Sequence, residues 1–130
     1  MSTTKVLVID DNEAHAEGLA ELLEISGYDA FYATSGQQGI DLALSHRVDA
    51  VLLDINLPDM SGYEVCRRLR MEQKIADLAI VFHTAAMPTG VHHQADAFLT
   101  YPIEMSHICH VIQGCIARRK MGRTATVSHR

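Results

Sequence analysis

Hydrophobic positions along the chain form two kinds of segment that alternate. Short apolar or alternating runs, closed by turn residues, predict five β-strands at about 5–9, 28–34, 50–54, 78–82 and 97–100. Between them, apolar residues recur at helical spacing and predict helices at about 13–26, 35–45, from 61 onward, and 104–120. Ser35 with Gln38 and Ser61 with Glu64 have the spacing of capping boxes, and Gly27 is a suitable helix stop.

Strands that alternate with helices, and that are apolar on both faces, predict a parallel sheet covered on both sides. We therefore expect an α/β fold with a doubly wound, flavodoxin-like sheet of five parallel strands in the order 2-1-3-4-5. Residues 1–120 should form this single domain. Residues 121–130 are polar and basic, and we expect them to be a flexible C-terminal tail.

Polar side chains follow the predicted strands where each strand ends. Asp10 and Asp11 follow the first strand, Asp54 ends the third, Thr84 follows the fourth and Tyr101 follows the fifth. Because the carboxyl ends of parallel strands share one edge of the sheet, these residues should lie together there. The alternative is that Asp54 only hydrogen-bonds its own turn, as aspartates often do.

Three carboxylates within about 5 Å would repel one another by roughly 3 kcal/mol per pair at an effective dielectric constant near 20. Such a cluster either binds a cation or keeps a proton at a raised pKa. Hard oxygen ligands favour Mg²⁺ over a transition metal. Beside that ion, the Asp54 carboxylate would suit nucleophilic attack on a phosphoryl group to give an acyl phosphate, with the Thr84 hydroxyl as a hydrogen-bond donor.

Composition narrows the classes of partner. A net charge of −5 over 130 residues gives no reason to expect nucleic-acid binding. The chain has no apolar run of membrane-spanning length and no signal-peptide pattern, so we expect a cytoplasmic protein with no membrane partner. Three cysteines without CxxC spacing are typical of reduced thiols.

The motif set resembles the receiver domain of two-component response regulators over about residues 4–120. The similar residues are Asp10-Asp11, Asp54, Asn56-Leu57-Pro58-Asp59-Met60-Ser61-Gly62, Thr84-Ala85 and Tyr101-Pro102. The resemblance implies a signalling protein rather than an enzyme. It also implies a histidine kinase or phosphotransfer protein as phosphodonor, and a downstream protein target.

The same resemblance implies a role for individual residues. Asp54 would be the phosphoacceptor, and Mg²⁺ would be held by Asp11, Asp54 and the backbone carbonyl of Asn56, with Asp10 acting through water. Thr84 would be the hydroxyl that moves toward the phosphoryl group, and Phe98 would be the switch aromatic.

Two features depart from the family pattern. Tyr101 occupies the place of a lysine, and a phenol brings no positive charge at neutral pH. Losing that charge-assisted contact would cost on the order of 1.5–3 kcal/mol. The segment between Thr84 and Phe98 is also short and contains Pro88-Thr89-Gly90, so we expect the fourth helix to be missing or vestigial. The uncovered face near strands four and five would then form a homodimer or dock on another protein.

These departures leave two functions open. The first is a stand-alone response regulator that accepts a phosphoryl group at Asp54, and the second is a pseudo-receiver that keeps the fold without switching by phosphorylation. Enzymes of similar topology fit less well. Asn56 stands where a haloacid-type phosphatase needs a general acid, and Asp10-Asp11-Asn12-Glu13 would repel a flavin phosphate.

Overall fold

The chain folds into a five-stranded parallel sheet with helices on both faces. The structure is a computed structural model that describes residues 3–85 and 94–128. The strands are β1 (Lys5–Ile9), β2 (Asp29–Ala33), β3 (Ala50–Asp54), β4 (Ala79–Thr84) and β5 (Ala97–Thr100). The helices are α1 (Glu13–Ile25), α2 (Gly36–His46), α3 (Gly62–Met71), the short 3₁₀ helix η1 (Gln73–Ile75) and α4 (Met105–Ser128).

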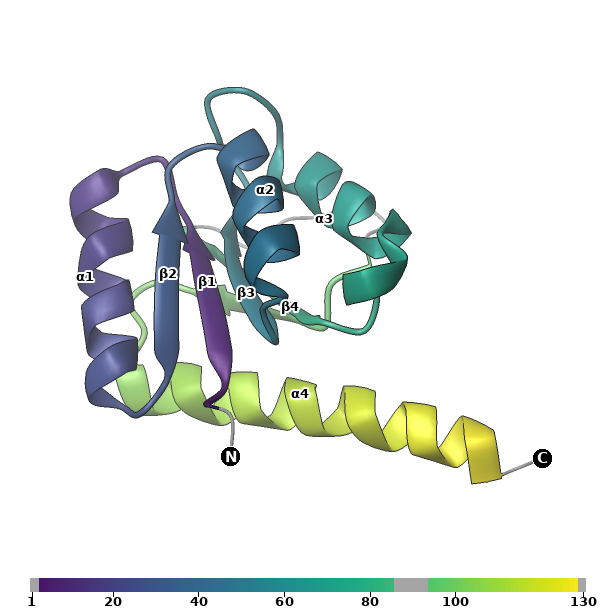
Figure 1. The fold of residues 1–130 in the computed structure, drawn as a ribbon. Helices are drawn as coiled ribbons and strands as arrows, with labels where there is room; N and C mark the ends of the chain where they lie inside the picture. Colours follow the sequence, from purple (N-terminus) through teal and green to yellow (C-terminus); the bar gives the residue numbers. More distant parts are fainter. Residues whose placement is uncertain (1–2, 86–93, 129–130) are drawn as a thin grey trace.

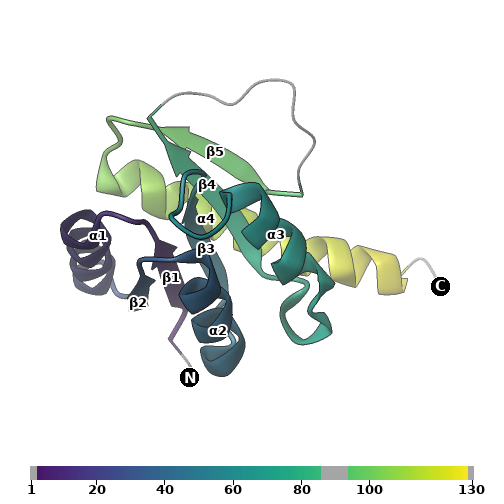
Figure 2. The same cartoon turned by 90° about the horizontal axis from the view of Figure 1, so that it is seen from above.

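The strand order is β2-β1-β3-β4-β5, and all four neighbouring pairs are parallel, which confirms the predicted doubly wound fold. Figures 1 and 2 show the sheet between its helices. Alternate residues of each central strand enter two separate cores. Leu7, Ile9 and Leu53 pack toward α2 and α3, whereas Val8 and Leu52 pack toward α1 and α4. Burial of both faces explains why these strands are continuously apolar.

The helix starts follow from local side-chain chemistry. Asn12, Ser35 and Ser61 each cap a helix by accepting a hydrogen bond from a backbone N–H three residues later. Both predicted capping positions at Ser35 and Ser61 are therefore confirmed. Gly27 has a φ of 103°, a conformation that favours glycine, and it follows Ser26, the C-cap residue of α1.

The last helix is longer than the sequence predicted. We expected it to end near Lys120, but α4 continues to Ser128, and Figure 1 shows its final turns running past the sheet. Thus the tail expected after residue 120 begins, over residues 121–128, as a continuation of that helix. The predicted loss of a fourth helix concerns residues 86–93, which lie outside the described residues. Residues 85 and 94–96, which flank that segment, are not helical.

A partly buried ion cluster joins the amino ends of β4 and β5 to the helices around them. The Asp96 carboxylate accepts hydrogen bonds from the Ile80 backbone N–H at 2.8 Å, from Arg70 at 3.0 Å and from Arg119 at 2.8 Å. Arg70 also donates to the backbone carbonyls of residues 76, 78 and 94. We call Arg70, Asp96 and Arg119 the Asp96 cluster. It fixes α3 and α4 to the start of the two edge-side strands.

Across residues 3–85 and 94–128, none of the helices combines the length and the hydropathy that crossing a lipid bilayer requires.

Candidate functional site

Three carboxylates meet at the carboxyl edge of the sheet. Asp10 directly follows β1, Asp11 is the next residue, and Asp54 ends β3, the strand that pairs with β1. One oxygen of each carboxylate lies within 4.8 Å of the others. Asp10 is buried, Asp54 is half-buried and Asp11 is exposed, so the cluster opens to solvent on one side. The topology therefore produces the juxtaposition that the strand ends predicted.

Asp10 is the most constrained member of the cluster. One of its oxygens accepts a hydrogen bond from the backbone N–H of Asn12 at 3.0 Å, and the other contacts Nδ1 of His15, a residue in the first turn of α1. Asn12 in turn caps α1. The start of α1 thus holds the buried carboxylate in place, whereas Asp11 is exposed and Asp54 is half-buried.

The loop after Asp54 has a compact shape that needs glycine at its end. Asn56 and Ser61 form a β-bridge, and the Gly62 N–H donates to the Ile55 carbonyl at 2.6 Å. A Cβ at Gly62 would lie 2.4 Å from the backbone oxygen of Asp54, so no larger residue fits without moving this loop. The Asn56 N–H also donates to the Asp54 carboxylate at 3.3 Å.

Asp59 fixes the far side of this loop, a role that the sequence did not reveal. Its carboxylate accepts hydrogen bonds from the backbone N–H groups of Gly36 at 2.8 Å and Gln37 at 2.9 Å, at the start of α2. These bonds lower the pKa of Asp59. The sequence carried no local signal for this role, because Asp59 is 23 residues from Gly36 along the chain and the helix start nearest to it is that of α3.

The electrostatics of the cluster favour a cation. Burial raises the pKa of the Asp54 carboxyl, and the negative charges of Asp10 and Asp11 raise it further, while the Asn56 N–H opposes the change. Among the described residues, no lysine or arginine forms an ion pair with these three carboxylates. A set of close carboxylate oxygens without a fixed cationic partner fits a hard divalent ion such as Mg²⁺.

Thr84 and Phe98 lie on the two strands beside the cluster. Thr84 is buried at the end of β4, and its carbonyl accepts a hydrogen bond from the Tyr101 N–H at 3.1 Å. Phe98 is half-buried on β5 and stacks on Phe82, with ring centroids 5.2 Å apart. Phe82 also contacts Tyr63 of α3. The aromatic position is therefore continuous with the core under the site.

Tyr101 is at the position where the resemblance expects a lysine, and its hydroxyl makes a hydrogen bond to a histidine. Its hydroxyl is hydrogen-bonded to Nδ1 of His83, the residue of β4 that pairs with Asp54 in the sheet. His83 is 2% exposed. The sequence predicted that this ring would pack away from Thr84, and it does lie among His15 and Tyr101. The hydrogen bond to Tyr101 was not foreseen, because nothing in the sequence indicates which strand-end side chains touch.

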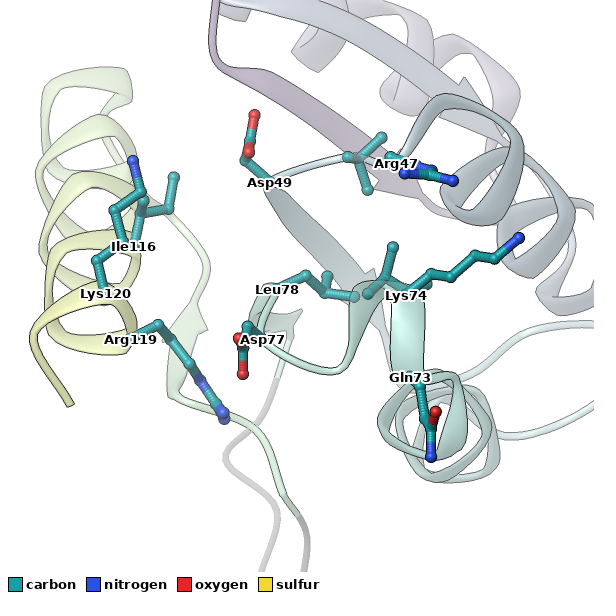
Figure 3. Close-up of a pocket in the computed structure, with 11 residues that line it drawn as sticks. Arg47, Asp49, Gln73, Lys74, Asp77, Leu78, Ile116, Arg119 and Lys120 are labelled. Atoms are coloured by element: carbon teal, nitrogen blue, oxygen red, sulfur yellow. The ribbon is translucent and has the colours of Figure 1, made fainter. Parts of the chain in front are cut away.

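A hollow of about 280 Å³ lies at the opposite edge of the sheet (Figure 3). It is lined by residues that precede β3 and β4 and by the middle of α4, among them Asp49, Leu78, Ile116 and Arg119. Because it opens at the amino ends of the strands, it is separate from the carboxylate cluster.

Comparisons with known proteins agree with this geometry. The family model of the response regulator receiver domain matches residues 6–113. The cell cycle response regulator CtrA of Brucella ovis is 33% identical over 126 residues, which are 95% of this chain and 54% of that protein. The chain thus spans about half the length of the curated relatives it matches.

Solved structures show the same fold. A CheY-like receiver domain from Methylobacillus flagellatus is 28% identical with a TM-score of 0.78, over 88% of this chain and 99% of the other. One from Methanospirillum hungatei has a TM-score of 0.81 at 21% identity, over 93% and 99% of the two chains, and it supports the fold alone.

Proposed function

The chain belongs to the response regulator receiver domain family, and from that premise we propose that it accepts a phosphoryl group on Asp54 in a Mg²⁺-dependent reaction. The observation that carries the proposal is the gathering of Asp10, Asp11 and Asp54 within 4.8 Å of one another at the carboxyl edge of the sheet. Asp54 is the member that combines partial burial with access to solvent, which suits a carboxylate that must be reached by a large phosphodonor.

The proposed step is a phosphoryl transfer from a phosphohistidine. A carboxylate oxygen of Asp54 attacks the phosphorus, the new O–P bond forms, and the P–N bond of the donor breaks. The electron pair of that bond stays on the imidazole nitrogen of the donor. The products are an aspartyl phosphate on Asp54 and an unmodified histidine on the partner.

The residues present fit a bound Mg²⁺. Asp11, Asp54 and the Asn56 carbonyl would hold it directly, and Asp10 would act through water. When bound, Mg²⁺ supplies positive charge that offsets both the carboxylates and the transferring phosphoryl group. The chain itself orients the acceptor, because the Asn56 N–H binds the Asp54 carboxylate and Gly62 keeps the loop close. The Thr84 hydroxyl, at the end of the next strand, would donate to a phosphoryl oxygen.

The partners follow from this reaction. The phosphodonor would be a histidine kinase or a phosphotransfer protein, and the response would pass to a downstream protein target. We retain the face near β4 and β5 as the place where a second copy or that target would dock. Phe98 on β5 is half-buried at that face, and its stacking on Phe82 would link docking to the core beneath Asp54.

The test is phosphorylation by a small-molecule phosphodonor. Wild-type protein should gain the mass of one phosphoryl group in the presence of Mg²⁺ and the donor, and chelation of Mg²⁺ should prevent the gain. Asp54→Asn should abolish it. Asp41→Asn, which changes an exposed aspartate of α2, is the matched control and should gain mass as the wild type does. Equal phosphorylation of Asp54→Asn and wild type would contradict the proposal.

A second function, that of a pseudo-receiver that binds partners without phosphorylation, is favoured by one observation. Tyr101 stands where the family has a lysine, and its hydroxyl is bonded to His83. Wild-type protein that binds Mg²⁺ at the cluster but shows no mass gain with any donor would support this second function. A gain that depends on Asp54 would exclude it.

A further inference from the structure

We propose that His83 is a positioning residue that withholds the Tyr101 hydroxyl from the acceptor site by accepting its hydrogen bond on Nδ1. The proposal rests on the function proposed above, in which Asp54 carries the phosphoryl group. It adds that the Tyr101 side chain borders the site in a fixed position without donating to a bound phosphoryl group. The hydrogen bond to His83 fixes that position.

The Tyr101 side chain contacts His83 and His15. The bond to His83 is the hydrogen bond of its hydroxyl among the described residues. The Tyr101 ring also meets two imidazole rings edge-on, with centroids 5.1 Å away for His15 and 5.5 Å away for His83. Because Tyr101 is only half-buried, these three contacts are what hold its side chain, and a turn toward Asp54 would break them.

His83 is built into the sheet and cannot follow such a movement. It is 2% exposed on β4, where it is the direct neighbour of Asp54 on β3. Its Nε2 is buried and has no hydrogen-bond partner in the described part of the chain. If the Tyr101 hydroxyl left, Nδ1 would lose its hydrogen bond at a buried position, and such a loss is costly. His83 therefore holds Tyr101 strongly.

The protonation states agree with this arrangement. Burial lowers the pKa of His83 to about 4, so the imidazole is neutral at pH 7. Burial also raises the pKa of Tyr101, and the charges of Asp10 and Asp54 raise it further, so the phenol keeps its proton. A neutral imidazole has one acceptor nitrogen and a phenol has one proton to donate. With that proton given to Nδ1, none remains for a phosphoryl oxygen.

The first test is nitrogen NMR of the histidine rings in the metal-free protein, which does not depend on phosphorylation. We expect His83 to be the tautomer with its proton on Nε2, and its Nδ1 signal to shift in Tyr101→Phe. A ring protonated on Nδ1, or a signal unchanged in Tyr101→Phe, would overturn the proposal.

The second test is a double-mutant cycle on the affinity for beryllofluoride in the presence of Mg²⁺. His83→Leu, of similar size, removes the acceptor and releases the hydroxyl. It should raise the affinity by about threefold, which is one added hydrogen bond to a fluoride. The same substitution in a Tyr101→Phe background should have no effect. An equal effect in both backgrounds, or a loss of affinity only when Tyr101 is present, would overturn the proposal.

The two tests separate this inference from the proposed function. If wild-type protein binds no beryllofluoride, the function of Asp54 as acceptor fails, while the NMR result still decides whether His83 holds Tyr101. If beryllofluoride binds in a manner that depends on Asp54 but the cycle shows no coupling, the function stands and the inference fails.

Discussion

Two groups of charged side chains lie at opposite edges of the same sheet, and they differ in whether the protein supplies partners for their negative charges. At the amino edge, the Asp96 carboxylate is surrounded by Arg70, Arg119 and a backbone N–H. At the carboxyl edge, Asp10, Asp11 and Asp54 face one another, and His15 is the basic side chain that contacts them in the described residues. The Asp96 carboxylate has positively charged partners from the protein itself, whereas the three carboxylates at the other edge have no lysine or arginine partner among the described residues.

The difference shows how a structural charge is distinguished from a functional one. In the Asp96 cluster the one carboxylate accepts hydrogen bonds from protein donors, so its charge stabilises the fold. In the carboxylate cluster, burial raises the pKa of Asp54 and the like charges of Asp10 and Asp11 raise it further, so the ionised form is disfavoured in the metal-free protein. This repulsion is what the proposed Mg²⁺ ion would relieve.

The largest expected change in the free energy of unfolding comes from a substitution in the Asp96 cluster. Asp96→Asn should lower the free energy of unfolding by about 3 kcal/mol, because it leaves the buried Arg70 without its counter-charge. Denaturation in urea measures this loss, and Asp41→Asn is the exposed control. If Asp96→Asn were as stable as that control, the cluster would not hold β4 and β5 to the helices.

A smaller change in the free energy of unfolding is expected from a substitution of Arg119, the partly exposed partner of Asp96. Arg119→Gln should lower the free energy of unfolding by about 1 kcal/mol, since Arg70 and the Ile80 N–H still bind Asp96. The same urea denaturation series provides the measurement. A loss as large as that of Asp96→Asn would mean that α4, rather than Arg70, is the main partner of this carboxylate.

The smallest expected effect has the opposite sign. In metal-free protein, Asp54→Asn should raise the free energy of unfolding by about 0.5 kcal/mol at pH 7, because it removes a charge from a repelling, half-buried group. The folded-state pKa of Asp54 lies above the ordinary value of 3.8. The folded protein therefore binds more protons than the unfolded chain between these two pKa values, and wild-type stability falls as the pH rises from one to the other. Below both values, where the carboxyl is protonated in both states, the advantage of the variant should disappear.

Thermal denaturation of wild type and Asp54→Asn at several pH values, with a chelator present, checks this sign. A variant that is less stable than the wild type at pH 7 would show that Asp54 is stabilised by its surroundings, like Asp96, and would remove the contrast between the two groups.

The carboxylate cluster was predictable from the sequence because its cause is topological. Asp10 and Asp54 end adjacent apolar strands, and the order of the strands follows from their alternation with helices. The hydrogen bond between His83 and Tyr101 was not predictable in this way. Strand parity placed the His83 ring on one face, but the partner on that face comes from a strand tip 18 residues away.

The Asp96 cluster and the end of α4 were also missed, for different reasons. Asp96 precedes a short strand and Arg70 ends a helix, and neither position suggests a buried ion pair. The residues after Lys120 are polar, and this composition predicts a flexible tail rather than further helix. Helical hydrogen bonds within α4 need no apolar face to continue to Ser128.

Calorimetric titration with Mg²⁺ tests most directly whether the three carboxylates share one cation. The account predicts one site per chain in the wild type, with affinity lowered about tenfold or more in both Asp11→Asn and Asp54→Asn, and unchanged in Asp41→Asn. Wild-type protein that binds no Mg²⁺, or that binds it equally well after Asp54→Asn, would contradict the account.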